Sequence, residues 1–366
     1  MVPGVRWLVV AAVALALVSA PTLVRAIPPS GSDVGARALA TRIRAAQDTG
    51  WSGEVRSRGT LAVPISDSAF SSIARLLGED TDLRVWWRTS TDWRVDRLRG
   101  TGESDLAVDG GLAVRWRYET RKVSVLPYSK IRLPEDSDVV PVSLAHRMLS
   151  GAKASELTRL ASRRIAGHSA AGLRLVPADK RSTIGHVDIW ADDATAIPLR
   201  VDVYAEGKPR TPVVSTQLVS FDATRPSTQD THLDLAPGLS FSRGVSLDEA
   251  AGANAFAPFA PPERLVGLKR LGDPVDFGAV GVYGRGPTAI LAIPLRGFVA
   301  RGLREQMRKS TTSRELGTGV ALEVGPISIL LSDIAHGHFL IAGTVSPATL
   351  EAASNDLDGS VQRITR

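Results

Sequence analysis

Residues 83–95 read LRVWWRTSTDWRV, and residues 106–118 read LAVDGGLAVRWRY. In both stretches apolar and aromatic residues alternate with arginine and other polar residues, and this period of two predicts β-strands. Asp109-Gly110-Gly111 interrupts the second stretch, and these residue types tolerate the positive φ that a tight reversal needs. The region from residue 51 to residue 126, which holds five of the seven tryptophans, therefore predicts successive strands of one antiparallel sheet.

Counting alternate residues along each strand predicts one apolar, aromatic face and one arginine-rich face. We expect the apolar face to line a ligand cavity. Two readings stay open for each aromatic residue: it fills the core beneath the helices, or it borders a cavity for an acyl chain or a hydrophobic peptide. Trp86 and Trp87 cannot both point inward, because neighbours on a strand face opposite sides. The expected cavity residues are Leu83, Val85, Trp87, Trp93, Val95, Val114, Trp116 and Tyr118.

Apolar residues at helical spacing predict four helices around this sheet. Ser32 caps the first helix, its apolar stripe is Leu39, Ile43 and Ala46, and Gly50 ends it. A large antiparallel sheet with helices laid on one face is an α+β layout. The other helices are expected at residues 66–78, 141–149 and 155–163, and later strands at residues 171–176, 186–191, 199–205 and 213–221.

The composition changes in residues 241–262, where proline, glycine and alanine dominate and predict a linker. It separates a first domain, residues 33–240, from a second, residues 263–366. The second domain is expected to be a small α+β unit with the element order ββαβββα. Its helices are predicted at residues 298–309 and 346–357, the last one with Ser as cap and Pro at its first position.

The first 26 residues look like an export leader, either a signal peptide or a signal anchor. Arg6 forms a thin positive region, Trp7 to Ala20 is an unbroken apolar run, and Val24-Arg25-Ala26 suits a signal peptidase. The run is short for a spanning helix, which needs about 20 residues, and this favours cleavage over an uncleaved anchor. Both alternatives predict that the rest of the chain is extracytoplasmic.

Charged residues make up 22% of the chain and hydrophobic residues 43%, as in ordinary folded proteins. The formal net charge of +6 is spread along the chain. It suits a protein near an anionic membrane surface, and it lacks the clustered stripe of a nucleic-acid binder. The basic residues at 115–122 and 301–309 are either solvated faces or contacts for anionic headgroups or an acidic partner. The absence of cysteine excludes disulfides, thiolate zinc sites and a lipid-modified N-terminal cysteine.

The sequence offers no set of residues that predicts catalysis. His336-Gly337-His338 with Asp333 lacks the third ligand and the supporting contacts of a metal site, and a solvated turn is the prediction. Gly284-Arg285-Gly286 reads as a hairpin turn, because it is not set between a strand and a helix as a dinucleotide loop is. No nucleophile elbow, serine-lysine pair or zinc-protease helix is present. We predict neither enzyme activity nor a cofactor.

Several stretches resemble the LolA-like lipoprotein-carrier fold, in the version of the RseB/MucB-type periplasmic regulators and their actinobacterial relatives. The resemblance covers roughly residues 33–240, and the second domain is similar to the small C-terminal domain of RseB. The stretches that carry it are Trp51-Ser52-Gly53, residues 84–87, residues 93–96, Asp109-Gly110-Gly111, residues 172–177, residues 187–192 and residues 197–201.

The resemblance implies a half-open β-barrel with a helical lid, whose concave apolar face holds acyl chains. It also implies a function as an envelope sensor that regulates a membrane anti-sigma factor, or as a carrier of lipid or lipoprotein. The partners would be a lipid acyl chain or a lipoprotein, the extracytoplasmic part of an anti-sigma factor, and the membrane surface. The alternative is a structural envelope protein whose barrel is packed and takes no ligand.

Overall fold

The computed structural model describes residues 33–61, 71–100, 102–128, 132, 134–234, 240–243, 259–272 and 278–363. The predicted leader and most of the predicted linker lie outside these residues. In the described part of the chain, no helix combines the length and the apolar character that a membrane span requires.

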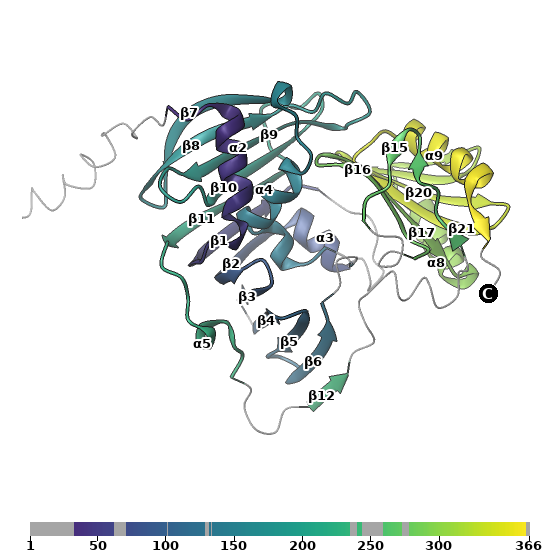
Figure 1. Cartoon of the computed structure of the whole chain (residues 1–366). Helices are drawn as coiled ribbons and strands as arrows, with labels where there is room; N and C mark the ends of the chain where they lie inside the picture. The colour runs from purple at the N-terminus through teal and green to yellow at the C-terminus, as the bar shows by residue number, and fades with distance from the viewer. Residues whose placement is uncertain are drawn as a thin grey trace, which may run out of the picture.

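A twelve-stranded sheet forms the larger part of the molecule (Figure 1). Its strand order is β12-β6-β5-β4-β3-β2-β1-β11-β10-β9-β8-β7, antiparallel except where β12 pairs in parallel with β6. The sheet is open, with β12 and β7 at its edges, so the predicted α+β class and large antiparallel sheet are confirmed. Its strands are β1 Trp51–Gly59, β2 Asp80–Thr89, β3 Asp92–Arg99, β4 Gly102–Asp109, β5 Leu112–Arg117, β6 Lys122–Pro127, β7 Leu157–Ile165, β8 His168–Leu175, β9 Ile184–Asp192, β10 Pro198–Ala205, β11 Val214–Asp222 and β12 Ser240–Arg243.

Helices cover one face of this sheet, which we call the inner face. Helix α2 (Ala36–Ala45) packs on β7 and β8, and α4 (Pro141–Leu149) packs on β10 and β11 (Figure 1). Leu39 and Ile43 are buried as predicted, because their spacing puts them on the side of α2 that faces the sheet. The first helix begins after Gly35 without a side-chain cap, so the prediction of Ser32 as its cap is wrong. Short helices α3 (Ser71–Gly78) and α5 (Thr228–Thr231) and 3₁₀ turns η1 (Ala46–Asp48), η2 (Asp136–Val139) and η3 (Ala154–Glu156) complete this part.

The predicted helix at residues 155–163 is wrong, because these residues form β7 after the turn η3. Leu157 and Leu160 have helical spacing, and this suggested an apolar helix face. A bulge between Leu160 and Arg163 interrupts the pairing with β8 and hides the alternation of a strand. Its many arginines fit its position at the sheet edge, where charged residues discourage pairing with other chains.

A six-stranded antiparallel sheet, in the order β16-β17-β21-β20-β19-β18, forms the smaller part of the molecule. Helix α8 (Gly297–Arg308) packs on one face through Leu303 and Met307, and α9 (Pro347–Ser360) packs on the other through Leu350 and Leu357. The sequence predicted each of these elements except β18. The strands are β16 Gly281–Arg285, β17 Thr288–Leu295, β18 Ser313–Leu316, β19 Gly319–Val324, β20 Ile327–Ile334 and β21 Gly337–Gly343.

Two further pairs of short strands lie beside this sheet in the described part of the chain. Strands β14 (Arg264–Leu265) and β15 (Leu268–Lys269) form a small hairpin, and β13 (Phe259–Ala260) pairs with β22 (Gln362–Arg363). Val266 and Gly267 at the tip of the hairpin both have positive φ, as a tight two-residue reversal requires. This hairpin lies where the two sheets approach each other and helps to form a cavity described below.

Candidate functional site

A row of aromatic rings crosses the inner face of the large sheet. Trp87 stacks on Trp51, with ring centroids 6.4 Å apart, and on Trp93, with centroids 5.7 Å apart. Phe221 packs at one end of the row, and Tyr128 packs edge-on at the other. We call these five residues the aromatic row. The register of β11, β1, β2 and β3 brings Phe221 and the three tryptophans together, and Tyr128 reaches Trp93 from the position after β6.

The three tryptophans of the aromatic row are buried beneath other parts of the chain, and Phe221 and Tyr128 are partly buried. Trp51, Trp87 and Trp93 are at most 3% exposed, and Leu83, Val85 and Val95 beside them are 1% exposed. Trp87 donates its indole N–H to the carbonyl of Gln47 in η1, at 2.8 Å. Five of the eight predicted cavity residues therefore lie together on the inner face, where the protein's own side chains cover them.

The other three predicted cavity residues, Val114, Trp116 and Tyr118, lie on the opposite face, which we call the outer face. The two-residue turn Gly110-Gly111 places Val108 opposite Ala113, so Ala113 is the inner residue at this point of β5. The expectation that all eight share one face is wrong, because alternation within each strand does not fix its phase relative to the next. Trp116 is partly buried and Tyr118 is 60% exposed.

The same register places some of the residues predicted for the arginine-rich face on the inner face instead. Arg115 points to the inner face, where its guanidinium lies 2.5 Å from Glu135, so the reading of it as a solvated residue is wrong. Trp86, in contrast, lies on the outer face with the guanidinium of Arg94 over its ring at 5.0 Å. The prediction that Trp86 and Trp87 face opposite sides is confirmed.

Residues 134–140, which we call the strap, cross the inner face beside the aromatic row. Val139 and Val140 join the same buried cluster as Trp87 and Trp93. The strap is also held by charges: Asp136 pairs with Arg97 at 3.2 Å, and Glu135 pairs with Arg115. It thus combines an apolar contact with ion pairs to two inner-face arginines of β3 and β5.

Asp138 is the most buried carboxylate of the strap, with a side chain 6% exposed. Arg132 donates to it at 2.6 Å, and Arg147 of α4 also pairs with it. Burial raises the pKa of the Asp138 carboxyl, but Arg147 and Arg132 outweigh this effect and hold the pKa below its usual range. For Asp136, burial dominates and raises the pKa despite Arg97. The strap is therefore charged, largely desolvated and tied to α4.

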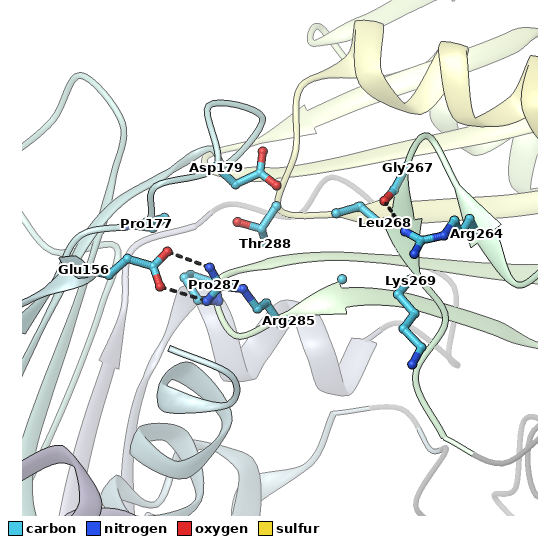
Figure 2. A pocket seen from close by; sticks show the side chains of 11 residues that line it. Glu156, Pro177, Asp179, Arg264, Gly267, Leu268, Lys269, Arg285, Pro287 and Thr288 are labelled. Carbon is cyan, nitrogen blue, oxygen red and sulfur yellow. Dashed lines mark hydrogen bonds and ion pairs between the residues drawn. The ribbon is translucent and has the colours of Figure 1, made fainter. Parts of the chain in front are cut away.

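The two sheets meet at a seam where Arg285 of β16 reaches the loop after α4. Its guanidinium forms two hydrogen bonds with Glu156, at 2.9 and 2.8 Å (Figure 2). It forms a third with the carbonyl of Gly151. Glu156 also accepts hydrogen bonds from the backbone N–H groups of Lys153 and Ala178. Burial alone would raise the pKa of Glu156, but Arg285 and these N–H groups lower it to about 2.

A cavity of about 220 Å³ lies at this seam. Its walls come from both sheets and from the β14–β15 hairpin, and they carry more cations than acids (Figure 2). Glu156 is neutralised by Arg285 and Asp179 by Arg181, which leaves a surplus of positive charge from Arg264 and Lys269. No local pattern in the sequence indicates this cavity, because its walls come from segments about 100 residues apart.

The His336-Gly337-His338 turn is near the surface. His338 pairs with Asp333 through Nδ1 at 2.6 Å, and Arg304 pairs with the same carboxylate at 2.6 Å. Among the described residues, the three potential metal ligands that lie together are Asp96, Glu103 and Asp105, and neither histidine belongs to this group.

Comparison with known proteins gives similarities of structure. No family model matches the chain, and no curated protein matches it. The Pseudomonas aeruginosa MucA/MucB complex has a chain with 14% identity and a TM-score of 0.48, covering 90% of this chain and 98% of that one. MucB in complex with the periplasmic part of MucA gives 14% identity and a TM-score of 0.47, covering 90% and 100%. The LolA-superfamily protein NE2245 from Nitrosomonas europaea gives 10% identity and 0.25, covering 55% and 99%. The chain is thus similar in structure to MucB and to a LolA-superfamily protein, the two groups that its sequence resembles.

Proposed function

We propose that this chain is a non-enzymatic, extracytoplasmic binding protein that holds an acyl chain or the lipid of a lipoprotein on its inner face. In this proposal it acts as an envelope sensor or carrier. The observation that carries the proposal is the aromatic row beside a strap that is held partly by ion pairs. Burying an acyl chain contributes about 0.8 kcal/mol per CH₂, and an aromatic face that the strap has left is a suitable surface for it.

In this proposal the strap can be displaced from the inner face. Buried ion pairs gain little net free energy, because the desolvation of both charges offsets their attraction. Arg97, Arg115, Glu135 and Asp136 all bear such costs beside an apolar surface. A lipid that binds the inner face would compete with these ion pairs and with the packing of Val139 and Val140 in the same cluster.

The strap also connects the inner face to the seam. Its turn η2 leads directly into α4, and the loop after α4 receives Arg285. A guest that displaces the strap would move α4, and this movement would change how the small sheet is held. In the sensor form of the proposal, the small sheet and the seam hold the extracytoplasmic part of a membrane anti-sigma factor, as the sequence resemblance implies. The carrier form needs no such partner.

The test uses quenching of tryptophan fluorescence by a brominated fatty acid. We expect saturable quenching in the wild type and tighter binding, by about tenfold, when Glu135→Gln and Asp136→Asn release the strap, since about 1.4 kcal/mol of competition corresponds to tenfold. Trp93→Phe should remove part of the quenched signal. Trp86→Phe is the matched control, because it removes one tryptophan from the outer face and should leave the quenched component unchanged.

A packed envelope scaffold is the second candidate, and the near-complete burial of the aromatic row favours it. It predicts that neither the wild type nor the strap variant is quenched, and that native mass spectrometry of protein purified from its own membrane gives a bare mass. Co-purifying lipid together with quenching in the strap variant supports the binding function. If neither co-purifying lipid nor quenching is found, the packed scaffold is the candidate that the data support.

A further inference from the structure

Three carboxylates gather on the outer face of the large sheet, on the opposite side from the aromatic row. Asp96 of β3 and Asp105 of β4 lie directly opposite each other in the register, and Glu103 is two residues from Asp105 on the same face. One oxygen from each of the three lies within 4.8 Å of those of the other two. Antiparallel pairing alone therefore concentrates three negative groups at one point.

The charges at this point are not balanced. Arg94 binds Asp96 through two hydrogen bonds, at 2.7 and 2.6 Å, and lies 3.7 Å from Asp105. When all three carboxyl groups are ionised, this guanidinium compensates one of the three negative charges and two remain. Asp96 and Asp105 have side chains 2% and 0% exposed, so water does little to compensate them.

The environment of Asp105 distinguishes this group from an ordinary acidic patch. Its side chain is completely buried, and both carboxylate oxygens lack a hydrogen-bond donor. Buried polar groups in folded proteins nearly always have a partner, and one without a partner calls for an explanation such as an ion. The unsatisfied oxygens face Asp96 and Glu103, since the three ligand atoms lie so close together.

We propose that Asp96, Glu103 and Asp105 form a binding site for a divalent cation, with Ca²⁺ as the best match. Ca²⁺ takes carboxylate oxygens at about 2.3–2.6 Å in flexible geometry, so a single ion bridges ligand atoms that lie within 4.8 Å of one another. Its two positive charges equal the uncompensated charge. Glu103 is only partly buried and provides the side from which the ion enters. The bound ion joins β3 to β4.

The neighbouring tryptophan gives a direct test with Tb³⁺ as a luminescent substitute for Ca²⁺. Trp116 lies opposite Asp105 in the register, where cross-strand side chains are about 5 Å apart, and excitation of this ring should sensitise a bound Tb³⁺. We expect saturable Tb³⁺ emission from the purified full chain, displaced by Ca²⁺. Trp116→Phe should lower the emission while calorimetry shows unchanged Ca²⁺ affinity.

Asp105→Asn should lower the affinity for Ca²⁺ by at least about tenfold, because it replaces an anionic carboxylate ligand by a neutral amide. Asp82→Asn is the matched control: Asp82 is an exposed carboxylate on the same face that pairs with Arg56, and its loss should leave the affinity unchanged. Ca²⁺ should raise the Tm of the wild type and of Asp82→Asn but not of Asp105→Asn. The far-UV spectrum of each variant verifies its fold.

The proposal is overturned if the wild type shows no saturable Tb³⁺ emission and no heat with Ca²⁺ at pH 8. Emission that Ca²⁺ does not displace also overturns it. So does an Asp105→Asn variant that binds Ca²⁺ as tightly as the wild type. None of these outcomes bears on lipid binding, which concerns the other face of the sheet.

Discussion

Ala113 and Val114 show how far single residues could be placed from the sequence. The alternation of apolar residues located Leu83, Val85 and Trp87 correctly on the inner face. In β5 the larger apolar residues occupy the outer face, and small Ala113 occupies the inner one. Assigning the larger apolar residues of β5 to the inner face therefore gave the wrong face. The register followed from the two-residue turn, and counting across that turn would have corrected the prediction.

A pair of substitutions in β5 tests this assignment. Ala113→Asp should destabilise the protein by about 3 kcal/mol or more, because it puts an unpaired charge on the buried face, where Ala113 is 5% exposed. Val114→Asp, one residue later on the partly solvated outer face, should cost about 1 kcal/mol. Urea denaturation measures both. Equal losses would mean that β5 is assigned to the wrong phase.

At the scale of elements, strands and helices with uninterrupted periodicity were predictable, as α4, β9 and β10 show. Strand β7 was not, because its bulge interrupts the alternation. The strap was not predictable either. Its position depends on arginines of β3 and β5, and no local pattern shows which distant charges will pair.

The contribution of the strap's ion pairs can be measured with a double-mutant cycle on Arg115 and Glu135. Replacing Glu135 by Met should cost about 3 kcal/mol, because it leaves the charge of Arg115 largely buried without its carboxylate. Replacing Arg115 by Met should cost less, because Glu135 keeps its ion pair with Arg132 at 3.0 Å. Replacing both by Met should cost much less than the sum of the two. Hydrogen exchange in residues 134–140 should rise in the single variants and fall back in the double variant. Additive losses would show that the two side chains do not interact.

At the scale of the whole molecule, the seam unites segments that the sequence presents as separate domains. Arg285 and Glu156 form its ion pair, and Thr183 and Thr344 form a backbone hydrogen bond across it. Gly286 fits against the carbonyl of Met148 in a positive-φ conformation, and an added Cβ would lie 2.6 Å from that oxygen. Contacts of this kind depend on the completed fold of both sheets, so the sequence alone could not predict them.

The seam should respond to acid through Glu156. Its pKa is about 2 in the folded protein and about 4.5 when unfolded, so its stabilising effect is complete above pH 4.5 and is lost as the pH falls toward 2. Glu156→Gln should therefore be less stable than the wild type at pH 6, and the difference should shrink at pH 3. Chemical denaturation at both pH values measures it. A difference of equal size at both would show that the carboxylate charge is not responsible.

Strand β12 has a consequence for access to the large sheet. After β11 the chain leaves the middle of the sheet and returns at its far margin, where four residues run parallel to β6 on their way to the small sheet. The chain thus covers this edge of β6 with its own residues. An extended peptide from another protein would pair with the backbone of β6 only by displacing this segment.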